Sequence, residues 1–211
     1  MKTTNTDVYG FEHAIRGMRN PKESWGKSDS ITYEFQPGLF KFSIGNADAE
    51  LSKKLAKAGT EHCKHLRLIQ VWFDLEAPRY FWQEFDTYRN VEKISCSTMN
   101  KLFERELTIE DFELKDIEDS KLLDVLQITI DEINDLRYIY KKSPDDDYLR
   151  RAKILLLESF IQKRTINTNY QQLLNIYRQR KNHRLLQWQE FCEWIEELPY
   201  FKELTGIEYK K

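Results

Sequence analysis

The stretch from Ile69 to Met99 constrains the fold more than any other, because it sets a strand, a proline and an aromatic helix in a fixed order. Residues 66–75 alternate between apolar and polar side chains, which predicts a strand with one buried face. Pro78 ends this strand, and a short helix that ends near Arg89 follows it. These features predict a buried strand whose end is surrounded by aromatic side chains. Such side chains can belong to the protein core or form a platform on which a flat ligand stacks. The helix carries four large aromatic side chains, Tyr80, Phe81, Trp82 and Phe85.

Small side chains follow the aromatic helix in the run Ser95-Cys96-Ser97-Thr98. Hydroxyl groups near Arg89 fit a phosphate, and the same run also fits an ordinary turn. No histidine or other base lies at a telling distance from Cys96 along the chain, so we do not expect this thiol to act as a nucleophile.

The apolar periodicity of the whole chain predicts an α+β fold, with a small mixed sheet, flanking helices and a helical C-terminal half. We expect a single domain over residues 1–211, with a mixed α/β part at 1–106 and a helical part at 107–211. Turn residues at 36–38 predict a hairpin over 31–44, and Thr108 is the expected N-cap of a helix. The other helices are expected at 11–19, 48–58, 120–141, 147–163, 168–180 and 184–197.

The net charge of −2 argues against a protein that grips nucleic acid along a broad basic face. One short basic run at 178–184 leaves nucleic-acid binding as a minor alternative. No apolar run approaches the ~18 residues that a membrane span needs, and the first seven residues lack the apolar centre of a signal peptide. We therefore expect a cytoplasmic protein that does not bind a membrane.

Three distant cysteines form no C-x-x-C pair, so neither a zinc site nor a disulfide framework is expected. The run Glu61-His62-Cys63-Lys64-His65 holds several potential metal ligands, but its spacing fits no known motif. We interpret it as a polar loop and expect no metal. Near the C-terminus, Arg180 ends a helix that also carries Asn175, and this pair fits either a clamp for a phosphate or carbonyl or a solvated basic face.

Taken together, these segments resemble the flavin-dependent thymidylate synthases, the ThyX family. In that family an Ala-Pro turn leads through an aromatic helix to an Arg-His-Arg triplet and a serine-containing phosphate loop. Ala77-Pro78, Thr87-Tyr88-Arg89 and Ser97 stand at matching distances. The family's C-terminal pattern N-x-R-x-L-x-N-x-x-x-x-R, followed by a Q-W-E helix, is similar to N-Y-Q-Q-L-L-N-I-Y-R-Q-R and Q-W-Q-E here. The resemblance covers residues 8–195.

The resemblance implies a homotetramer that binds FAD and dUMP at a site shared between subunits. NADPH and methylenetetrahydrofolate are then the co-substrates, dTMP is the product, and no protein nucleophile is needed. Arg180 becomes the catalytic residue, since it matches the arginine that polarises the uracil ring. The implied cofactor-binding residues are Thr60, Arg89, Asn169 and Asn175, and the implied substrate-binding residues are Gln83, Ser95, Ser97 and Arg180.

The chain departs from the family at four characteristic positions. Thr87 and Tyr88 replace an arginine and a histidine, and Met99 and Gln171 each replace an arginine. Each lost charge-assisted contact to phosphate costs about 1.5–3 kcal/mol of binding free energy. The cations that we expect to compensate are Arg79, Lys93, Arg178 or Arg184.

Two functions remain open on this reading. The first is a divergent FAD-dependent thymidylate synthase-like enzyme that transfers a one-carbon unit to C5 of the uracil of dUMP or a related pyrimidine deoxynucleotide. The second is a non-catalytic nucleotide-binding or interaction protein on a ThyX scaffold, for example from a phage or mobile element. The departures at Thr87 and Tyr88 favour the second.

Overall fold

The computed structural model describes residues 1–208, and the chain divides into two compact units. The first unit holds residues 1–2, 75–88 and 94–165, and the second holds residues 3–74, 89–93 and 166–208. Strands carry the chain from one unit to the other, so each unit is built from several separate segments.

The fold class is α+β, as predicted. Four strands pair in the order β1 (Lys2–Tyr9), β4 (Gln70–Pro78), β6 (Ile161–Asn169) and β5 (Glu92–Ser95). A separate antiparallel hairpin pairs β2 (Ile31–Gln36) with β3 (Leu39–Ser43). The α-helices are α1 (Phe11–Arg19), α2 (Asn46–Ala58), α3 (Arg79–Phe85), α4 (Thr98–Lys101), α5 (Ser120–Lys142), α6 (Asp146–Leu155), α7 (Tyr170–Arg180), α8 (Leu186–Glu196) and α9 (Phe201–Thr205).

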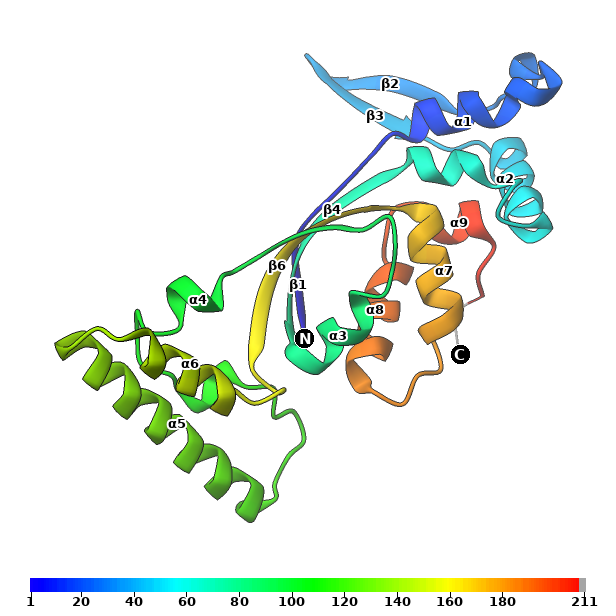
Figure 1. Cartoon of the computed structure of the whole chain (residues 1–211). Coiled ribbons are helices and arrows are strands. Elements are labelled where there is room, and N and C mark those ends of the chain that lie inside the picture. Colours follow the sequence, from blue (N-terminus) through cyan, green and yellow to red (C-terminus); the bar gives the residue numbers. More distant parts are fainter. Residues whose placement is uncertain (209–211) are drawn as a thin grey trace. The chain divides into compact units, whose positions relative to one another are not determined.

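The first unit is organised around the long helix α5, which packs against α6 (Figure 1). Asp119 caps α5 by accepting a hydrogen bond from the amide of Leu122 at 3.1 Å. Thr108 is the predicted N-cap, and it forms a capping box with Asp111 at the start of a short 3₁₀ helix (Ile109–Asp111). One apolar face of α5 therefore closes the core of this unit. Its buried residues include Leu102, Phe103, Phe112, Leu126, Ile130, Ile133, Leu136 and Leu149.

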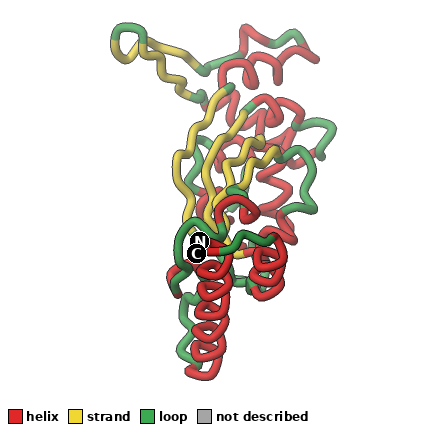
Figure 2. Tube along the Cα trace, turned by 60° about the vertical axis from the view of Figure 1, so that its left-hand side comes forward, coloured by secondary structure: helices red, strands yellow, loops and turns green. Residues whose placement is uncertain are grey.

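The second unit has an aromatic core beneath helices α7, α8 and α9. The tube view in Figure 2 shows the helices of the chain in red and its strands in yellow. Tyr170 begins α7 and is fully buried, with its hydroxyl donating to the carbonyl of Pro199 at 2.6 Å. This contact ties the strand-to-helix junction before α7 to the chain just before α9. The other large buried side chains include Phe73, Tyr177, Trp188, Phe191 and Phe201.

Several predicted elements are confirmed with small shifts at their ends: the helices at 11–19, 120–141, 168–180 and 184–197 and the hairpin. The strand predicted at 66–75 lies at 70–78, with the expected alternation of Val71, Phe73 and Leu75 toward the core. Three strands, β1, β5 and β6, were not predicted. The helix expected at 147–163 was wrong in its second half, because α6 ends at Leu155 and β6 begins at Ile161. The part at 107–211 is accordingly not wholly helical.

Helix α2 buries two polar residues, Asp48 and Ser52, together with Ala49 and Ala56. Leu51 and Leu55 are only half-buried. Asp48 and Ser52 find buried hydrogen-bond partners. A polar residue with satisfied partners can occupy a buried position that hydrophobicity alone gives to leucine.

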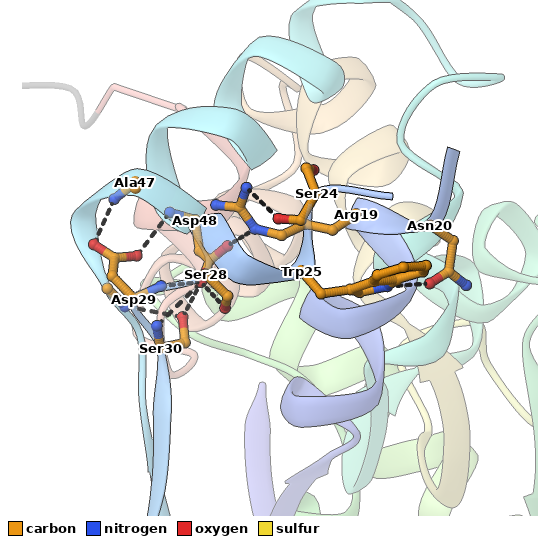
Figure 3. Close-up of polar contacts among 10 residues, drawn as sticks. Arg19, Asn20, Ser24, Trp25, Ser28, Asp29, Ser30, Ala47 and Asp48 are labelled. Carbon is orange, nitrogen blue, oxygen red and sulfur yellow. Dashed lines mark hydrogen bonds and ion pairs between the residues drawn. The ribbon is translucent and has the colours of Figure 1, made fainter. Parts of the chain in front are cut away.

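Buried Asp48 holds the segment between α1 and α2 in place (Figure 3). Its Oδ1 accepts from Nε of Arg19 at 2.6 Å. Its Oδ2 accepts from the hydroxyls of Ser28 at 2.6 Å and Ser30 at 2.7 Å, and from the amides of Asp29 and Ser30. Burial alone raises the pKa of Asp48, but these hydrogen bonds and the charge of Arg19 outweigh it, so the pKa is lowered. The residue is a buried, fully satisfied carboxylate.

His65 is buried in the same unit and is not part of a polar loop. Its Nε2 lies 2.7 Å from the hydroxyl of Ser52, which also lies 2.6 Å from the carbonyl oxygen of Leu204. If that hydroxyl donates to Leu204, Nε2 carries the imidazole proton, and Nδ1 is buried without a hydrogen-bond partner among the described residues. Burial lowers the pKa of His65 from 6.5 to about 4.

The buried imidazole makes stability depend on pH. Because the unfolded chain takes up a proton near pH 6.5 and the folded chain only near pH 4, stability is lost as the pH falls through this window. At pH 5 the shift corresponds to a loss of about 2 kcal/mol relative to pH 7.5. We expect urea unfolding at the two pH values to show this loss, and His65→Gln to remove most of it. An unchanged pH dependence in His65→Gln would contradict the assignment, and His62→Gln, at an exposed position in the same segment, is the control.

Candidate functional site

A cationic cavity in the first unit contains the predicted substrate residue Gln83. Its volume is about 300 Å³, and Gln83 comes to it from α3, together with Arg79 and Trp82. Arg164 of β6 and Lys153 of α6 add two further cations, against two carboxylates, Asp86 in the lining and Glu158 beside Arg79. The excess of positive charge suits an anionic group such as a phosphate. The remaining lining residues are Thr98, Leu156 and Gln162.

Arg164 is fixed in the wall of this cavity. Its guanidinium lies 4.2 Å from the centre of the Trp82 ring, and Nη1 donates to both carboxylate oxygens of Asp86 at 2.8 and 3.0 Å. Trp82 is itself held, because its indole nitrogen donates to the carbonyl of Ala77 at 2.9 Å. Nε of Arg164 is buried and has no hydrogen-bond partner among the described residues. A buried donor without a partner is costly, so this nitrogen is a candidate contact for a ligand.

Lys153 of α6 lies beside Met99, the loop position at which the resemblance leads us to expect an arginine. Its ammonium is 3.0 Å from the sulfur of Met99, the residue that replaces that arginine. Met99 is 57% exposed and provides no charge of its own. The positive charge missing from position 99 is therefore present next to it, supplied by another helix.

Arg79 and Gln83 are held near each other by one carboxylate. Nε2 of Gln83 donates to Oε2 of Glu158 at 2.9 Å, and Nη2 of Arg79 lies 3.4 Å from Oε1 of the same residue. Arg79 also donates to the carbonyl of Leu156 at 2.7 Å. Of the four cations named from the sequence as compensating residues, Arg79 lies in this cavity. Arg178, in the second unit, instead donates to the carbonyl of Ala56 at 3.2 Å.

Ser97 lines a second cavity of the first unit, of about 230 Å³, which shares Thr98 and Gln162 with the first. Lys101, Arg105 and Lys163 line it as well. Ser95 is exposed at the end of β5 and is not among the residues that line either cavity. The structure thus brings Gln83 and Ser97 to neighbouring cavities and leaves Ser95 at the surface.

The residues that replace the arginine and histidine of the triplet make local contacts. The hydroxyl of Thr87 donates to the carbonyl of Glu84 at 2.7 Å. The ring of Tyr88 packs edge-on against Phe85, with 6.3 Å between centroids. Both side chains therefore contribute to the end of α3.

In the second unit, Gln171 connects the predicted flavin residue Thr60 to helix α7. Nε2 of Gln171 donates to the carbonyl of Thr60 at 3.1 Å, and its Oε1 accepts from Nε of Arg67. Gln171 stands where the ThyX resemblance leads us to expect an arginine. It binds the guanidinium of Arg67 instead. Arg67 is exposed and was not considered from the sequence. Thr60 is exposed beside this connection.

The other predicted residues of this unit lie along α7 or before β5. Asn169 is the N-cap of α7, and its Oδ1 accepts from the amide of Gln172 at 3.0 Å. Asn175 is half-buried on the same helix, and Arg89 is exposed. Arg180 ends the helix, with its guanidinium 4.6 Å from the centre of a ring of Trp188 in α8. Stacking on a buried indole fixes the plane of the guanidinium.

No cluster of three or more potential metal ligands occurs within residues 1–208. Cys63 is buried, and its Sγ lies 3.7 Å from the carbonyl oxygen of Thr60. Nε2 of His62 lies 3.6 Å from Oε1 of Glu61. The helices of the described part of the chain are all too short or too polar to cross a membrane.

Lys153, Arg164 and Arg67 are among the cations of these sites that the sequence did not reveal. Arg164 lies in Gln162-Lys163-Arg164-Thr165, a polar run without the alternation that marks a strand. Lys153 was expected in a long helix, and nothing in the sequence indicated that its ammonium would lie next to Met99. The one usable signal was the loss of arginines at expected positions, because lost charges suggest that others replace them.

No protein-family model and no curated protein matches the chain. Two solved structures of the flavin-dependent thymidylate synthase ThyX from Helicobacter pylori, both with FAD and dUMP, are similar to it. Each covers 96% of this chain and is itself covered to 96%, at 17% sequence identity, with TM-scores of 0.68 and 0.72. At this identity the similarity establishes the fold, and the two chains correspond over nearly their whole length. The chain therefore has a ThyX-like fold.

Proposed function

We propose that this chain is a divergent flavin-dependent thymidylate synthase-like enzyme, which transfers a one-carbon unit to C5 of the uracil of dUMP or a related pyrimidine deoxynucleotide. The observation that carries the proposal is the correspondence, over 96% of both chains, with ThyX structures that contain FAD and dUMP. In keeping with the ThyX resemblance, we also propose a cytoplasmic homotetramer, with NADPH and methylenetetrahydrofolate as co-substrates.

The cavity around Gln83 supports a phosphate site. Arg79, Lys153 and Arg164 supply three cations against the two carboxylates of Asp86 and Glu158, and Nε of Arg164 is a buried donor that needs an acceptor. A phosphate oxygen fits such a donor, because charge-assisted hydrogen bonds are roughly twice as strong as neutral ones. We assign this cavity to the phosphate of the nucleotide, and Ser97 to its neighbourhood.

The residues proposed for FAD fit a polar, anionic cofactor. Arg89 and Thr60 are exposed donors, Asn175 is half-buried, and Arg67 is held close to Thr60 through Gln171. Asn169 fits less well, because its side-chain oxygen Oδ1 already caps α7. Its side-chain nitrogen Nδ2 is then the atom that can donate to a ligand. A bound flavin supplies the redox chemistry of the reaction.

Arg180 is the proposed catalytic residue. A guanidinium stays charged at neutral pH and offers parallel donors, so it can polarise a carbonyl group of the uracil ring. Trp188 holds the plane of this guanidinium, and it is fully buried. The role of Trp188 is therefore to position Arg180.

Replacing Lys153 tests the phosphate site. We expect Lys153→Met to weaken dUMP binding by about 1.5–3 kcal/mol, because it removes one charge-assisted contact to the phosphate. Isothermal titration calorimetry with dUMP and with deoxyuridine measures the effect. The loss should be confined to dUMP, since deoxyuridine has no phosphate. Equal affinities of the variant and the wild type for dUMP would place the phosphate elsewhere. Lys121→Met, exposed at the start of α5, is the matched control.

A non-catalytic nucleotide-binding protein on the same scaffold is the second candidate. The observation that favours it is that Thr87 and Tyr88 stand where the ThyX resemblance leads us to expect an arginine and a histidine. Thr87 donates to the carbonyl of Glu84, and Tyr88 packs against Phe85. Thermal-shift measurements with dUMP, dTMP and FAD separate the two. Stabilisation by the nucleotides without stabilisation by FAD supports the binding protein, and stabilisation by both supports the enzyme.

A further inference from the structure

The second unit holds a cavity of about 360 Å³ that none of the proposed ligands explains. Its lining joins helix α1 to the hairpin and includes Arg19, Ser28 and Ser30, which contact Asp48 (Figure 3). Cavities that hold small ligands start at about 300 Å³. The side chains that matter are Trp25 and Phe42, which supply rings, and Glu12, Arg16 and Arg19, which supply charge.

The rings in this cavity are held in fixed orientations. Trp25 is 49% exposed, yet its indole nitrogen donates to Oδ1 of Asn20 at 2.9 Å, as Figure 3 shows. Phe42 stacks on Phe11 at 5.6 Å and meets Tyr200 edge-on at 6.0 Å. An exposed indole fixed by a hydrogen bond is a ready platform for a flat ring, and a base stacks on such a surface without further ordering.

The charges around the cavity are balanced. Arg19 is only 5% exposed and is neutralised by Asp48 behind it, while Arg16 and Glu12 carry opposite charges on α1. Two cations and two carboxylates leave no net charge. The balance favours an uncharged polar ring over a phosphate or another anion, in contrast to the cationic cavity of the first unit.

Glu12 and Arg16 are one helical turn apart, so the carboxylate and the guanidinium are neighbours on α1. Glu12 accepts a hydrogen bond from Thr32 at 3.0 Å with one oxygen, Oε2. Arg16 has a long contact of 3.5 Å to Nδ1 of His13 through Nη2. A carboxylate has about four acceptor positions and a guanidinium five donors, so both keep capacity for a ligand.

We propose that this cavity binds a guanine base as part of a nucleoside or nucleotide. Guanine presents two adjacent N–H donor groups and a carbonyl on one edge, which match a carboxylate beside a guanidinium. Arginine is a frequent partner of the guanine O6 and N7 acceptors, and carboxylates accept from N–H groups of bases. Trp25 stacks on the base. Glu12 accepts from its N–H groups, and Arg16 donates to its O6.

Calorimetric titration of the full-length protein with guanosine, adenosine and uridine tests the proposal, since none of these carries a phosphate for the cationic cavity. We expect guanosine to bind, and adenosine and uridine to bind at least tenfold more weakly. Trp25→Leu and Glu12→Gln should each weaken guanosine binding at least tenfold. Trp72→Leu is the matched control, because Trp72 is also partly exposed, at 40%, and does not line the cavity.

Three results would overturn the proposal: no binding of guanosine at millimolar concentration, equal binding of the three nucleosides, or unchanged guanosine affinity in Trp25→Leu. Thermal unfolding of each variant shows whether it is folded, and Glu12→Gln tests the proposal with an isosteric change at an exposed position. The result is independent of dUMP and FAD binding, which concern other residues.

Discussion

Replacing Asp48 by alanine lowers the free energy of unfolding by about 3–5 kcal/mol, the typical effect of removing one partner from a buried ion pair. The substitution leaves the buried guanidinium of Arg19 without its carboxylate. It also removes the acceptor of Ser28 and Ser30 and of two backbone amides. Urea unfolding followed by circular dichroism measures the change.

Asp29 provides the matched control, because it is a neighbouring carboxylate that caps a helix and is not part of the buried ion pair. It accepts from the amides of Ala47 at 2.8 Å and Asp48 at 3.1 Å, so it caps the start of α2 from outside the helix. We expect Asp29→Ala to cost about 0.5–2 kcal/mol, as for other helix caps. If Asp48→Ala cost no more than Asp29→Ala, the buried carboxylate would not be the residue that holds α1 to α2.

On the proposed function, we expect the replacement of Arg180 by alanine to slow dUMP-dependent oxidation of reduced flavin about 10²–10³-fold and to leave the fold intact. Removing one donor that stabilises developing negative charge costs about 10²–10³-fold in kcat. The fold should persist because Arg180 is half-buried at the end of α7, and Trp188 keeps its place in the core without it. Stopped-flow absorbance of the flavin gives the rate, and circular dichroism gives the fold.

Arg178→Ala is the control on the same helix. Arg178 is exposed, and its Nη2 donates to the carbonyl of Ala56 at 3.2 Å. We expect its flavin oxidation to stay close to that of the wild type. Equal rates in Arg180→Ala and the wild type would remove Arg180 from the mechanism.

The sequence predicted the elements whose side chains follow a simple period. The alternation through Val71, Phe73 and Leu75 identified β4, and the turn at Gly38, where φ is 77°, identified the hairpin. Strand β6 was not predictable, because its polar run at 162–165 shows no alternation and its place is set by pairing with β4 and β5. Pairing of this kind joins residues far apart in the chain, and a local pattern cannot reveal it.

The candidate sites were predictable where a motif stood in one segment. Gln83 and Ser97 were named from the sequence and line cavities. Lys153 and Arg164 were not named, because they enter the first cavity from α6 and β6. Buried polar residues were missed for a related reason. Asp48 and His65 are buried because partners from other elements satisfy them, and a residue's partners are invisible in its own segment.

Titration of the purified full-length chain with FAD, with and without dUMP, tests the proposed function most directly. We expect a yellow protein that retains stoichiometric flavin through gel filtration, and a shift of the flavin absorption bands when dUMP is added. A folded, colourless protein that takes up no FAD at any dUMP concentration would contradict a flavin-dependent function on this scaffold.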